Sequence, residues 1–376
     1  MKSQEEILDS VDINQIPLFH KVAPHDVPDI ELQDVLNRLE DFPLIIDVRS
    51  EDEFKVSHLP HAINFPILNN EERREIGILY KYKGKETATA KALEFANPKL
   101  ASLKQLLDKD NHKNPLIYCW RGGGRSRYTT NELIKMGYNA IKLKNGHKAW
   151  RKVVHKALYN EEVPSFLVLK GLTGVGKTEL LRAIQDKYRF LDLEYYARNA
   201  ASSFGRIPFQ ITNDYHFVSQ KSFEEQIYQE LYLNKTPISK YGVLAESESR
   251  RIGHLFLSNP LFERLKSSKT ILITCSIEKR VERTYKDYIG EKQEGLQLLF
   301  DDMQKIKKYM SNNQFNHLLS LYESNDIHEL LRILLVDYYD PKYSGIYPKE
   351  DLTIDSTDMD AAIESLLTHL QENSTI

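Results

Sequence analysis

The feature that most constrains the fold is a glycine-rich motif near the middle of the chain. Gly171-Leu-Thr-Gly-Val-Gly-Lys-Thr178 fits the pattern G-x-x-x-x-G-K-[ST], with the apolar run FLVLK before it and the helical pattern ELLRAIQDKY after it. Its glycines let backbone N–H groups face an anion, its lysine reaches a terminal phosphate, and its threonine can bind Mg²⁺. We therefore predict a strand, a phosphate-binding loop and a helix. The predicted ligand contacts are Gly171, Thr173, Gly174, Val175, Gly176, Lys177 and Thr178.

Acidic residues that follow two further strand-like runs are candidates for a metal site beside this loop. A nucleotide hydrolase holds its metal ion with an acid at the end of a neighbouring strand. Glu246 and Glu248 follow the run YGVLA, and Asp192 and Glu194 follow RFL. Of these, Glu248 is taken as a cofactor-binding residue, and no metal ligand is assigned. No motif for a nucleotide base stands out, so the phosphorylated ligand need not be ATP.

A second loop begins at Cys119, in the segment CWRGGGRS between an apolar run and a helical pattern. Cys119 and Arg125 are separated by five residues. Backbone N–H groups, Arg121, Arg125 and the start of the helix should together favour a nucleophilic thiolate. Three consecutive glycines permit the backbone angles that converging amides need. Cys119, Arg121 and Arg125 are the predicted catalytic residues, and the predicted anion contacts are Gly122, Gly123, Gly124 and Ser126.

The cysteine loop supports two chemistries. A thiolate in such a loop can take a chalcogen atom from a donor, as in a sulfurtransferase, or attack phosphorus, as in a C-x₅-R phosphatase. The spacing matches the phosphatase, but Tyr118 precedes the cysteine and no aspartate obviously placed as a leaving-group acid follows it. The other cysteine, Cys275, lies in the apolar run TILITCS and is predicted to be a core residue.

Strand-like runs and helical patterns alternate along the chain, which predicts an α/β protein with two domains. We expect a first domain at 14–156, a linker at 157–165 and a P-loop domain at 166–376. The first ordered strand is expected within 43–50. The pattern from about 301 to 335 is mostly helical, and the segment DYYDPKYSGIY after it is predicted to form turns.

The composition is typical of a globular protein. The 376 residues are 41% hydrophobic and 28% charged, and no apolar run approaches the roughly 18 residues that a spanning helix needs. The N-terminus lacks the basic and apolar regions of a signal peptide. We therefore expect a cytoplasmic protein with no membrane partner and no disulfide.

The formal net charge of −3 conceals basic and acidic regions. Residues 142–156 carry six Lys/Arg and no acid, and residues 73–104 carry eight Lys/Arg against three Glu. Aromatic residues and lysines interleave in YKYKGK, within the second of these stretches. The basic stretches form either a solvated helical face or a phosphate-binding face. Residues 348–376, with seven acids and one Lys, are expected to form an acidic tail.

Together these segments resemble the bacterial tRNA 2-selenouridine synthases, in which a rhodanese-like domain is fused to a P-loop domain. The segments similar to the first domain are IDVRSEDEF, HLPHAINFPI, ERREIGILYKYKGKETA, CWRGGGRS and NGHKAWR. Those similar to the second are GLTGVGKTELL, DLEYYA, SSFG, ESESRRIG and YYDPKY. The resemblance covers most of the chain. It implies an N-terminal rhodanese-like domain and a C-terminal P-loop NTPase-like parallel-sheet domain with a helical C-terminal part.

The same resemblance implies a transferase that acts on tRNA. Selenium from selenophosphate would replace the sulfur of 2-thiouridine at the wobble position of the anticodon stem-loop, after geranyl diphosphate has geranylated that sulfur. Cys119 would receive or help deliver selenium, and the P-loop would hold the geranyl donor's diphosphate. Both phosphorylated compounds are expected co-substrates, Mg²⁺ is a candidate cofactor, and an enzyme that supplies selenophosphate is a candidate partner. Asp47 and Arg49, in the DVR segment, are expected to brace the domain.

The sequence departs from the family pattern at two places. Asn199-Ala200-Ala201 replaces the family's His-Arg-Gly before SSFG, so no role of that histidine or arginine carries over. In SHLPHA, Ser57 and His61 stand where the rhodanese pattern has glycines, which is expected to change only a turn, and His58 is expected to be structural.

Two other functions fit the residues. One is a simple sulfurtransferase or C-x₅-R phosphatase with an accessory NTPase. The other is a nucleotide-gated tRNA-binding module, which has no catalytic activity. The basic stretches at 73–104 and 142–156 would hold tRNA in the synthase and in the binding module alike, so tRNA binding alone does not separate these two functions.

Overall fold

Two parallel sheets organise the chain, one in each of the units Met1–Val154 and His155–Ile376. The computed structural model describes residues 3–9, 27–109, 111–160, 162–200, 202–290, 293–342 and 350–371. The prediction of an α/β protein with parallel sheets is confirmed. No helix in the described part of the chain combines the length and apolarity that crossing a membrane requires.

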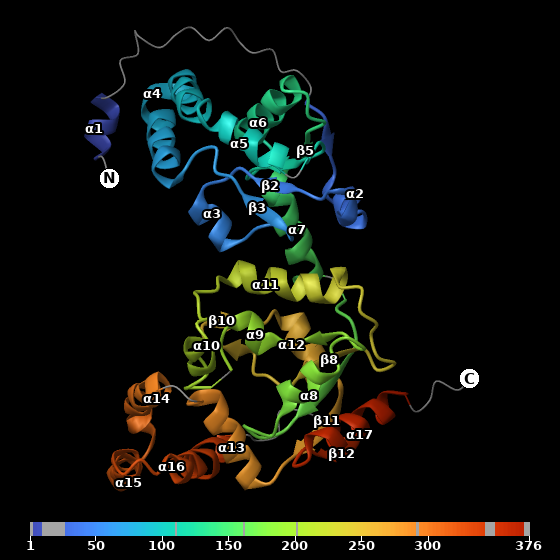
Figure 1. Ribbon diagram of the computed structural model, residues 1–376, viewed down its shortest axis with the longest axis vertical. Helices are drawn as coiled ribbons and strands as arrows, with labels where there is room; N and C mark the ends of the chain where they lie inside the picture. Colours follow the sequence, from blue (N-terminus) through green and yellow to red (C-terminus); the bar gives the residue numbers. More distant parts are fainter. Residues whose placement is uncertain are drawn as a thin grey trace. The chain divides into compact units, whose positions relative to one another are not determined.

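The first unit is built on a sheet with the strand order β1-β5-β4-β2-β3, in which every pairing is parallel. The central strands β2 (Ile45–Asp47) and β4 (Leu116–Tyr118) are buried at every residue, as expected for strands covered on both faces. The other elements (Figure 1) are α1 (Gln4–Asp9), β1 (Asp29–Ile30), α2 (Leu32–Asn37), α3 (Glu51–Val56), β3 (Ala62–Asn64), α4 (Asn70–Ala96), α5 (Lys99–Lys109), α6 (Gly124–Lys135), β5 (Ile141–Leu143) and α7 (Gly146–Tyr159).

Two features of this unit were not predicted from the sequence. The strand within 43–50 is not the first, because the edge strand β1 precedes it and pairs with β5. With only two residues, β1 has no apolar run that a sequence pattern can show. The long helix α4 is also interrupted at Gly84, whose φ of 88° and ψ of 176° lie outside the helical region. The interruption follows directly after the exposed segment that contains Tyr80 and Tyr82.

The second unit has a sheet with the order β12-β11-β6-β8-β7, again parallel throughout, and a separate hairpin of β9 and β10. Its strands are β6 (Phe166–Lys170), β7 (Phe190–Leu191), β8 (Val243–Glu246), β9 (Arg251–Ile252), β10 (Leu255–Phe256), β11 (Lys269–Thr274) and β12 (Leu352–Asp355). Its helices are α8 (Lys177–Ala183), α9 (Leu193–Ala197), α10 (Ile207–Ile211), α11 (Gln220–Tyr228), α12 (Asn259–Lys266), α13 (Ile277–Tyr288), α14 (Gln293–Ile306), α15 (Asn312–Glu323), α16 (Ile327–Ile333) and α17 (Met359–Gln371).

The acidic C-terminal segment is part of the fold and not a tail, within its described residues 350–371. Strand β12 pairs with β11 at the edge of the sheet, and α17 contacts α8 and β12. Ile354, Leu366 and Leu370 are buried in the same core as the sheet. The acids occupy the exposed side of these elements, so a regional count of charges did not reveal the apolar residues between them.

Helices α13 to α16 form a helical part beside the sheet (Figure 1). Their core includes Leu299, Leu330 and Leu334. The segment DYYDPK, predicted to form turns, continues the helical structure instead: Leu334–Tyr339 is a π-helix and Asp340–Lys342 a 3₁₀-helix. The rest of that predicted turn, residues 343–347, lies outside the described residues. Buried Tyr338 and Tyr339 explain the helical outcome, because they pack into this core.

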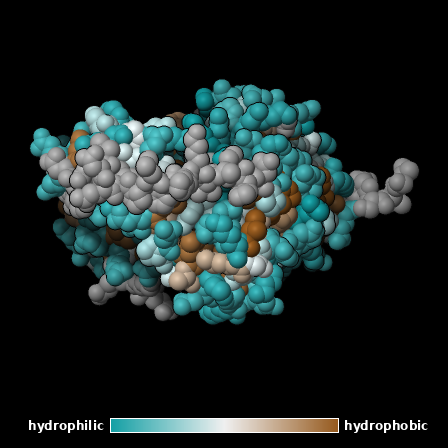
Figure 2. Space-filling model, turned by 90° about the horizontal axis from the view of Figure 1, so that it is seen from above, coloured by the Kyte–Doolittle hydropathy of each residue, from teal (hydrophilic) through white to brown (hydrophobic). Residues whose placement is uncertain are grey.

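The described surface that Figure 2 shows is mainly hydrophilic, and hydrophobic residues gather there only in small areas. This agrees with the 28% of charged residues in the sequence. Large exposed hydrophobic side chains are therefore informative where they occur. Those of the described residues with more than half of their surface exposed are Tyr80, Phe217, Ile238 and Tyr309.

A strained turn connects α3 to β3. The N–H of Ala62 donates to the carbonyl oxygen of Leu59 at 3.2 Å, so Pro60 and His61 are the central residues of a four-residue turn. His61 has a φ of 59°, the left-handed value that a type II turn requires at its third residue. A side chain at this position is unfavourable, which explains why the rhodanese pattern has glycine here. Ser57, the other substituted glycine, has an extended φ of 179°.

We expect His61→Gly to stabilise the first unit. Glycine adopts the left-handed conformation without the steric cost of a β-carbon, which is about 1 kcal/mol. Urea unfolding measures the change in the free energy of unfolding. His61→Ala is the matched control, because alanine keeps the β-carbon and should give no such gain. An equal effect of both substitutions would show that the imidazole, and not backbone strain, determines stability at this exposed position.

Candidate functional site

Cys119 lies in a loop between β4 and α6, at the carboxyl end of the sheet in the first unit. The side chain is 3% exposed, and its sulfur lies 3.2 Å from the hydroxyl oxygen of Ser126. The carbonyl oxygens of Cys119 and Trp120 accept hydrogen bonds of 2.9 Å from the backbone N–H groups of His147 and Lys148. The first turn of α7 therefore fixes the loop that carries the thiol.

Glycine is required at two points of this arrangement. Gly122 has a φ of 65°, and a β-carbon on it would lie 2.9 Å from the carbonyl oxygen of Leu143. A β-carbon on Gly146, in the segment NGHKAWR, would lie 2.1 Å from the carbonyl oxygen of Cys119. Gly123 and Gly124 have open space at the β-carbon position and no left-handed φ. Of the three glycines, therefore, only Gly122 has a left-handed φ, while Gly123 has a φ of −91° and a ψ of −143°.

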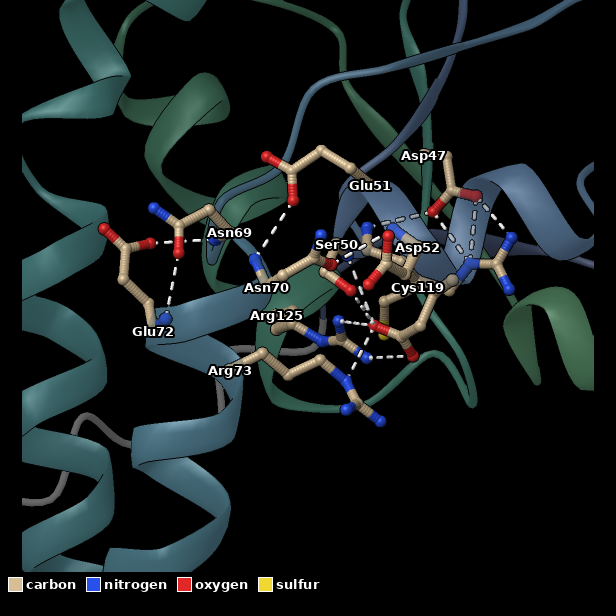
Figure 3. Close-up of polar contacts among 12 residues, drawn as sticks. Asp47, Ser50, Glu51, Asp52, Asn69, Asn70, Glu72, Arg73, Cys119 and Arg125 are labelled. Atoms are coloured by element: carbon tan, nitrogen blue, oxygen red, sulfur yellow. Dashed lines mark hydrogen bonds and ion pairs between the residues drawn. The ribbon is translucent and has the colours of Figure 1, made fainter. Parts of the chain in front are cut away.

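The two predicted arginines have different surroundings. Arg125 donates to both carboxylate oxygens of Glu53, at 2.6 and 3.2 Å, and Arg73 contacts the same carboxylate at 2.9 Å. Figure 3 shows the side chains of Arg73 and Arg125 near each other, close to Cys119. Arg121 is exposed and forms no ion pair with any residue that the structure describes. No described acid balances the charge of Arg121, whereas the charge of Arg125 is partly balanced by Glu53.

Glu53 was not predicted as a site residue, although the sequence contains a local signal for it. Glu53 follows Ser50 by three residues, and the two form the capping box of α3. Burial raises the pKa of Glu53, but the hydrogen bond and charge of Arg125 and the charge of Arg73 outweigh it and lower the pKa to about 2. Glu53, in α3, is therefore an ionised counter-charge to Arg125 of the cysteine loop.

Asp47 and Arg49 form a buried ion pair behind the loop. Their side chains are 0% and 1% exposed, and the shortest contact is 2.6 Å. Arg49 also donates to the carbonyl oxygen of Ser57 at 2.6 Å. This supports the expectation that the pair braces the domain. His58 stacks on Phe54 with ring centroids 4.0 Å apart, which fits a structural role as well.

The P-loop of the second unit joins β6 to α8, as the motif predicts. Gly171, Gly174 and Gly176 all have positive φ, and a β-carbon on Gly171 would lie 2.4 Å from the carbonyl oxygen of Ile273 in β11. The ammonium group of Lys177 donates to the carbonyl oxygen of Gly171 at 3.0 Å, so the lysine folds back over the loop. The predicted contacts from Gly171 to Thr178 thus form one continuous loop at the carboxyl end of the central strand.

Two arginines of α13 hold the P-loop backbone. Arg280 donates from Nε to the carbonyl oxygen of Thr173 at 2.9 Å, and its other nitrogens bind Asp340 at 3.0 and 2.6 Å. Arg283 contacts the carbonyl oxygen of Val175 at 3.5 Å and that of Ser356 at 2.7 Å. Sequence reasoning missed these residues, although Asp340 lies in YYDPKY and the arginines are three apart on one helix.

Cys275 lies directly after β11, and its surroundings only partly match the predicted core position. The thiol is half-buried and packs against the sheet core. Arg283 donates to its sulfur at 3.1 Å. It is therefore a cysteine at the edge of the core, beside the arginine that holds the P-loop.

Three of the four candidate acids lie together beside the P-loop. Carboxylate oxygens of Glu194, Glu246 and Glu248 are all within 4.8 Å of one another. Thr178 donates to Glu246 at 2.6 Å, which connects the cluster to the loop. The fourth candidate, Asp192, instead pairs with Arg182 at 2.8 Å and caps the N-terminus of α9.

The environment of these carboxylates favours their neutral forms. Burial and the charge of Glu246 raise the pKa of Glu248 to about 8, although the charge of Lys177 acts in the opposite direction. Burial and the neighbouring glutamates likewise raise the pKa of Glu194 well above its ordinary value. Hard carboxylate oxygens beside a phosphate-binding loop are the ligand set that Mg²⁺ prefers. A bound cation would remove the mutual repulsion that raises these pKa values.

Comparison with known proteins gives matches over both units. Residues 164–373 match the family model described as the tRNA 2-selenouridine synthase AAA domain, and residues 31–153 match the rhodanese-like domain. The tRNA 2-selenouridine synthase of Sulfurovum sp. is 30% identical over 328 residues, or 80% of this chain and 87% of that protein. Proteins with the same name from Nitrosomonas europaea and Chromohalobacter salexigens are 34% identical over 268 residues (70% and 68% of the two chains) and 30% identical over 348 residues (85% and 90%).

We expect Glu248→Gln to become more stabilising as the pH rises from about 5 to about 8. The pKa of Glu248 is about 8 in the folded protein, against an ordinary value of 4.5, so over this range the folded state holds a proton that the unfolded state releases. Wild-type stability therefore falls as the pH rises, while glutamine stays neutral. Urea unfolding with EDTA present measures the difference.

The exposed Glu263 provides the control for this measurement. Glu263→Gln should change the free energy of unfolding by the same small amount at both pH values. A Glu248→Gln effect that is equally constant with pH would contradict the raised pKa of Glu248.

Proposed function

The chain belongs to the tRNA 2-selenouridine synthase family, and from this premise we propose that it replaces the sulfur of a wobble 2-thiouridine in tRNA by selenium from selenophosphate, through an S-geranyl intermediate. Membership of the family makes it a tRNA-modifying enzyme with tRNA as its substrate. The observation that supports the two-step route is the presence of two separate anion-binding loops. Each loop can serve one phosphorylated co-substrate.

In the first step, the P-loop would hold geranyl diphosphate. The sulfur of 2-thiouridine attacks C1 of the geranyl group, a C–S bond forms, and the C–O bond to diphosphate breaks. Lys177 and the loop amides would stabilise the charge on the departing diphosphate. Thr178, Glu194, Glu246 and Glu248 would hold a Mg²⁺ ion, which would neutralise further charge on the diphosphate.

In the second step, the cysteine loop would hold selenophosphate by its phosphate oxygens. Selenium adds to C2 of the base, geranylthiolate leaves with the electron pair of the C–S bond, and water takes up the phosphoryl group to release phosphate. Arg121 is exposed for the anion, and Cys119 and Ser126 lie at the base of the loop. In this proposal Cys119 helps to deliver selenium, and Arg125 keeps the selenophosphate anion near this cysteine.

For tRNA docking we propose the basic stretches of the first unit, 73–104 and 142–156. Part of their charge is balanced within the protein, since Arg73, Lys99, Lys104, Lys142 and Lys144 all contact acids. The segment YKYKGK is better suited to RNA binding. Tyr80 and Tyr82 are 62% and 50% exposed, and lysines alternate with them, which suits base stacking together with phosphate contact.

We expect Cys119→Ser to abolish selenouridine formation while geranylation continues. The substitution removes the thiol but keeps a small polar side chain in the loop. Mass spectrometry of the nucleosides from 2-thiouridine tRNA measures both products. Cys275→Ser is the control and should leave both steps active. Selenouridine formation at the wild-type rate by Cys119→Ser would show that the cysteine takes no part in the mechanism.

We expect Lys177→Ala to reduce geranylation by at least about 100-fold, the typical cost of losing one group that stabilises transition-state charge. The same nucleoside assay measures it, and Lys187→Ala, on the exposed surface, is the control. Rapid ATP hydrolysis by the wild type without tRNA, together with normal geranylation by Lys177→Ala, would favour the alternative of an accessory NTPase.

A further inference from the structure

An exposed group of aromatic and basic side chains lies on the second unit, and none of its members belongs to the P-loop or to the carboxylate cluster. Phe217 is 76% exposed and Phe256 is 47% exposed. Arg250, Arg251 and His254 are exposed on the same hairpin as Phe256. We call these five side chains the hairpin platform. An exposed phenylalanine is unfavourable in water, so this pair needs an explanation.

The rings of the platform are held in place before any ligand binds. Phe217 stacks on His254 with ring centroids 5.0 Å apart and an interplanar angle of 17°. The guanidinium carbon of Arg251 lies 5.7 Å from the ring centre of Phe256, its cross-strand partner. Arg251 Nε also donates to the carbonyl oxygen of Gly253 at 2.9 Å. Each ring therefore has a cationic or polarisable group beside it.

Buried residues and hydrogen bonds anchor the hairpin below the platform. Ile252 and Leu255 point inward and are 0% and 1% exposed. The side chain of Gln220 binds both backbone groups of Phe256, with its oxygen accepting at 3.0 Å and its nitrogen donating at 2.8 Å. The alternation of buried and exposed residues is that of a two-sided strand, so the exposure of Phe256 follows from the register.

The charge of the platform favours an anionic ligand. Residues 215–220 and 249–257 contain two arginines, two histidines and no acid. Within the described chain, Arg250 and Arg251 form no ion pair with an acid. The nearby acid Asp214 contacts Arg198 at 3.4 Å instead. Exposed rings combined with uncompensated guanidinium groups are the recognition chemistry of single-stranded nucleic acid.

The platform is joined directly to the carboxylate cluster of the P-loop. Glu248 precedes Arg251 by three residues, so their Cα atoms are at most about 11 Å apart. The turn of the hairpin also lies against Asn199, two residues after the end of α9, because a β-carbon on Gly253 would lie 3.0 Å from the side chain of Asn199. Helix α9 supplies Glu194 to the cluster. RNA held on the platform would thus lie close to the site where geranylation is proposed.

We infer that the hairpin platform binds unpaired nucleotides of the anticodon loop and presents the neighbouring 2-thiouridine to the P-loop site. The inference rests on the proposed function, because tRNA is the expected substrate. Phe217 and Phe256 stack on bases, and Arg250 and Arg251 contact the phosphates. These side chains are positioning residues and take no part in bond formation.

Binding of an anticodon stem-loop RNA that carries 2-aminopurine in its loop tests the inference on the full-length chain. Stacking quenches the fluorescence of this base analogue. Phe217→Ala and Phe256→Ala should each weaken binding by at least about 5-fold and reduce the quenching, whereas Phe217→Trp should restore both. Because Phe217 is largely exposed, its substitution leaves the core intact. Tyr309→Ala, which removes another largely exposed ring elsewhere in the unit, should change nothing.

Geranylation kinetics give a second measurement. Phe217→Ala should raise the KM for RNA and leave the KM for geranyl diphosphate and the kcat near their wild-type values. A raised KM for geranyl diphosphate alone would show that the rings hold the isoprenoid chain, which overturns the inference. Wild-type RNA affinity and quenching in both alanine variants would overturn it as well.

These outcomes separate the platform from the proposed function. If the wild type modifies no RNA, the proposed function fails, yet the fluorescence assay still decides whether the platform binds RNA. If the wild type forms both products and the alanine variants match it in affinity, only the platform is wrong.

Discussion

Both candidate sites depend on close backbone contact that only glycine allows. Gly146 brings the start of α7 against the carbonyl oxygen of Cys119, and Gly171 brings the P-loop against the carbonyl oxygen of Ile273. A β-carbon at either position would overlap backbone atoms that cannot move without opening the sheet. In each unit this contact lies at the carboxyl end of parallel strands, where the chain leaves the sheet to form a binding loop.

A second shared feature is a glutamate that lies outside each loop motif and forms a hydrogen bond with a residue of that loop. Glu53 binds Arg125 in the cysteine loop, and Glu246 accepts from Thr178 in the P-loop. Buried polar groups without a partner are costly, so these contacts help to hold the loops in place. A phosphorylated ligand then has to replace or share their contacts. Glu53 and Glu246 thus help to hold the two sites together, although neither belongs to the cysteine-loop motif or to the P-loop motif.

The sequence was sufficient for features that depend on local pattern. The two loops follow apolar strands and precede helices, so Cys119 and Lys177 were found by their context. The contact of Glu53 with Arg125 was not predicted, because the two residues are 72 positions apart in the sequence and only the sheet brings them together. Strand β12 and helix α17 were also missed, since acids on their exposed side concealed the buried residues. The two-residue strands β9 and β10 were too short to show an alternating pattern. The hairpin platform, which depends on these strands, was therefore not predicted from the sequence.

The proposed route assigns one phosphorylated co-substrate to each loop, and nucleoside analysis with the wild type tests this most directly. Purified 2-thiouridine tRNA is incubated with the protein and geranyl diphosphate, with and without selenophosphate, and its nucleosides are identified by mass spectrometry. We expect S-geranyl-2-thiouridine without selenophosphate and 2-selenouridine when both compounds are present. Selenouridine formed equally well without geranyl diphosphate, or no S-geranyl product in its presence, would contradict the proposed route.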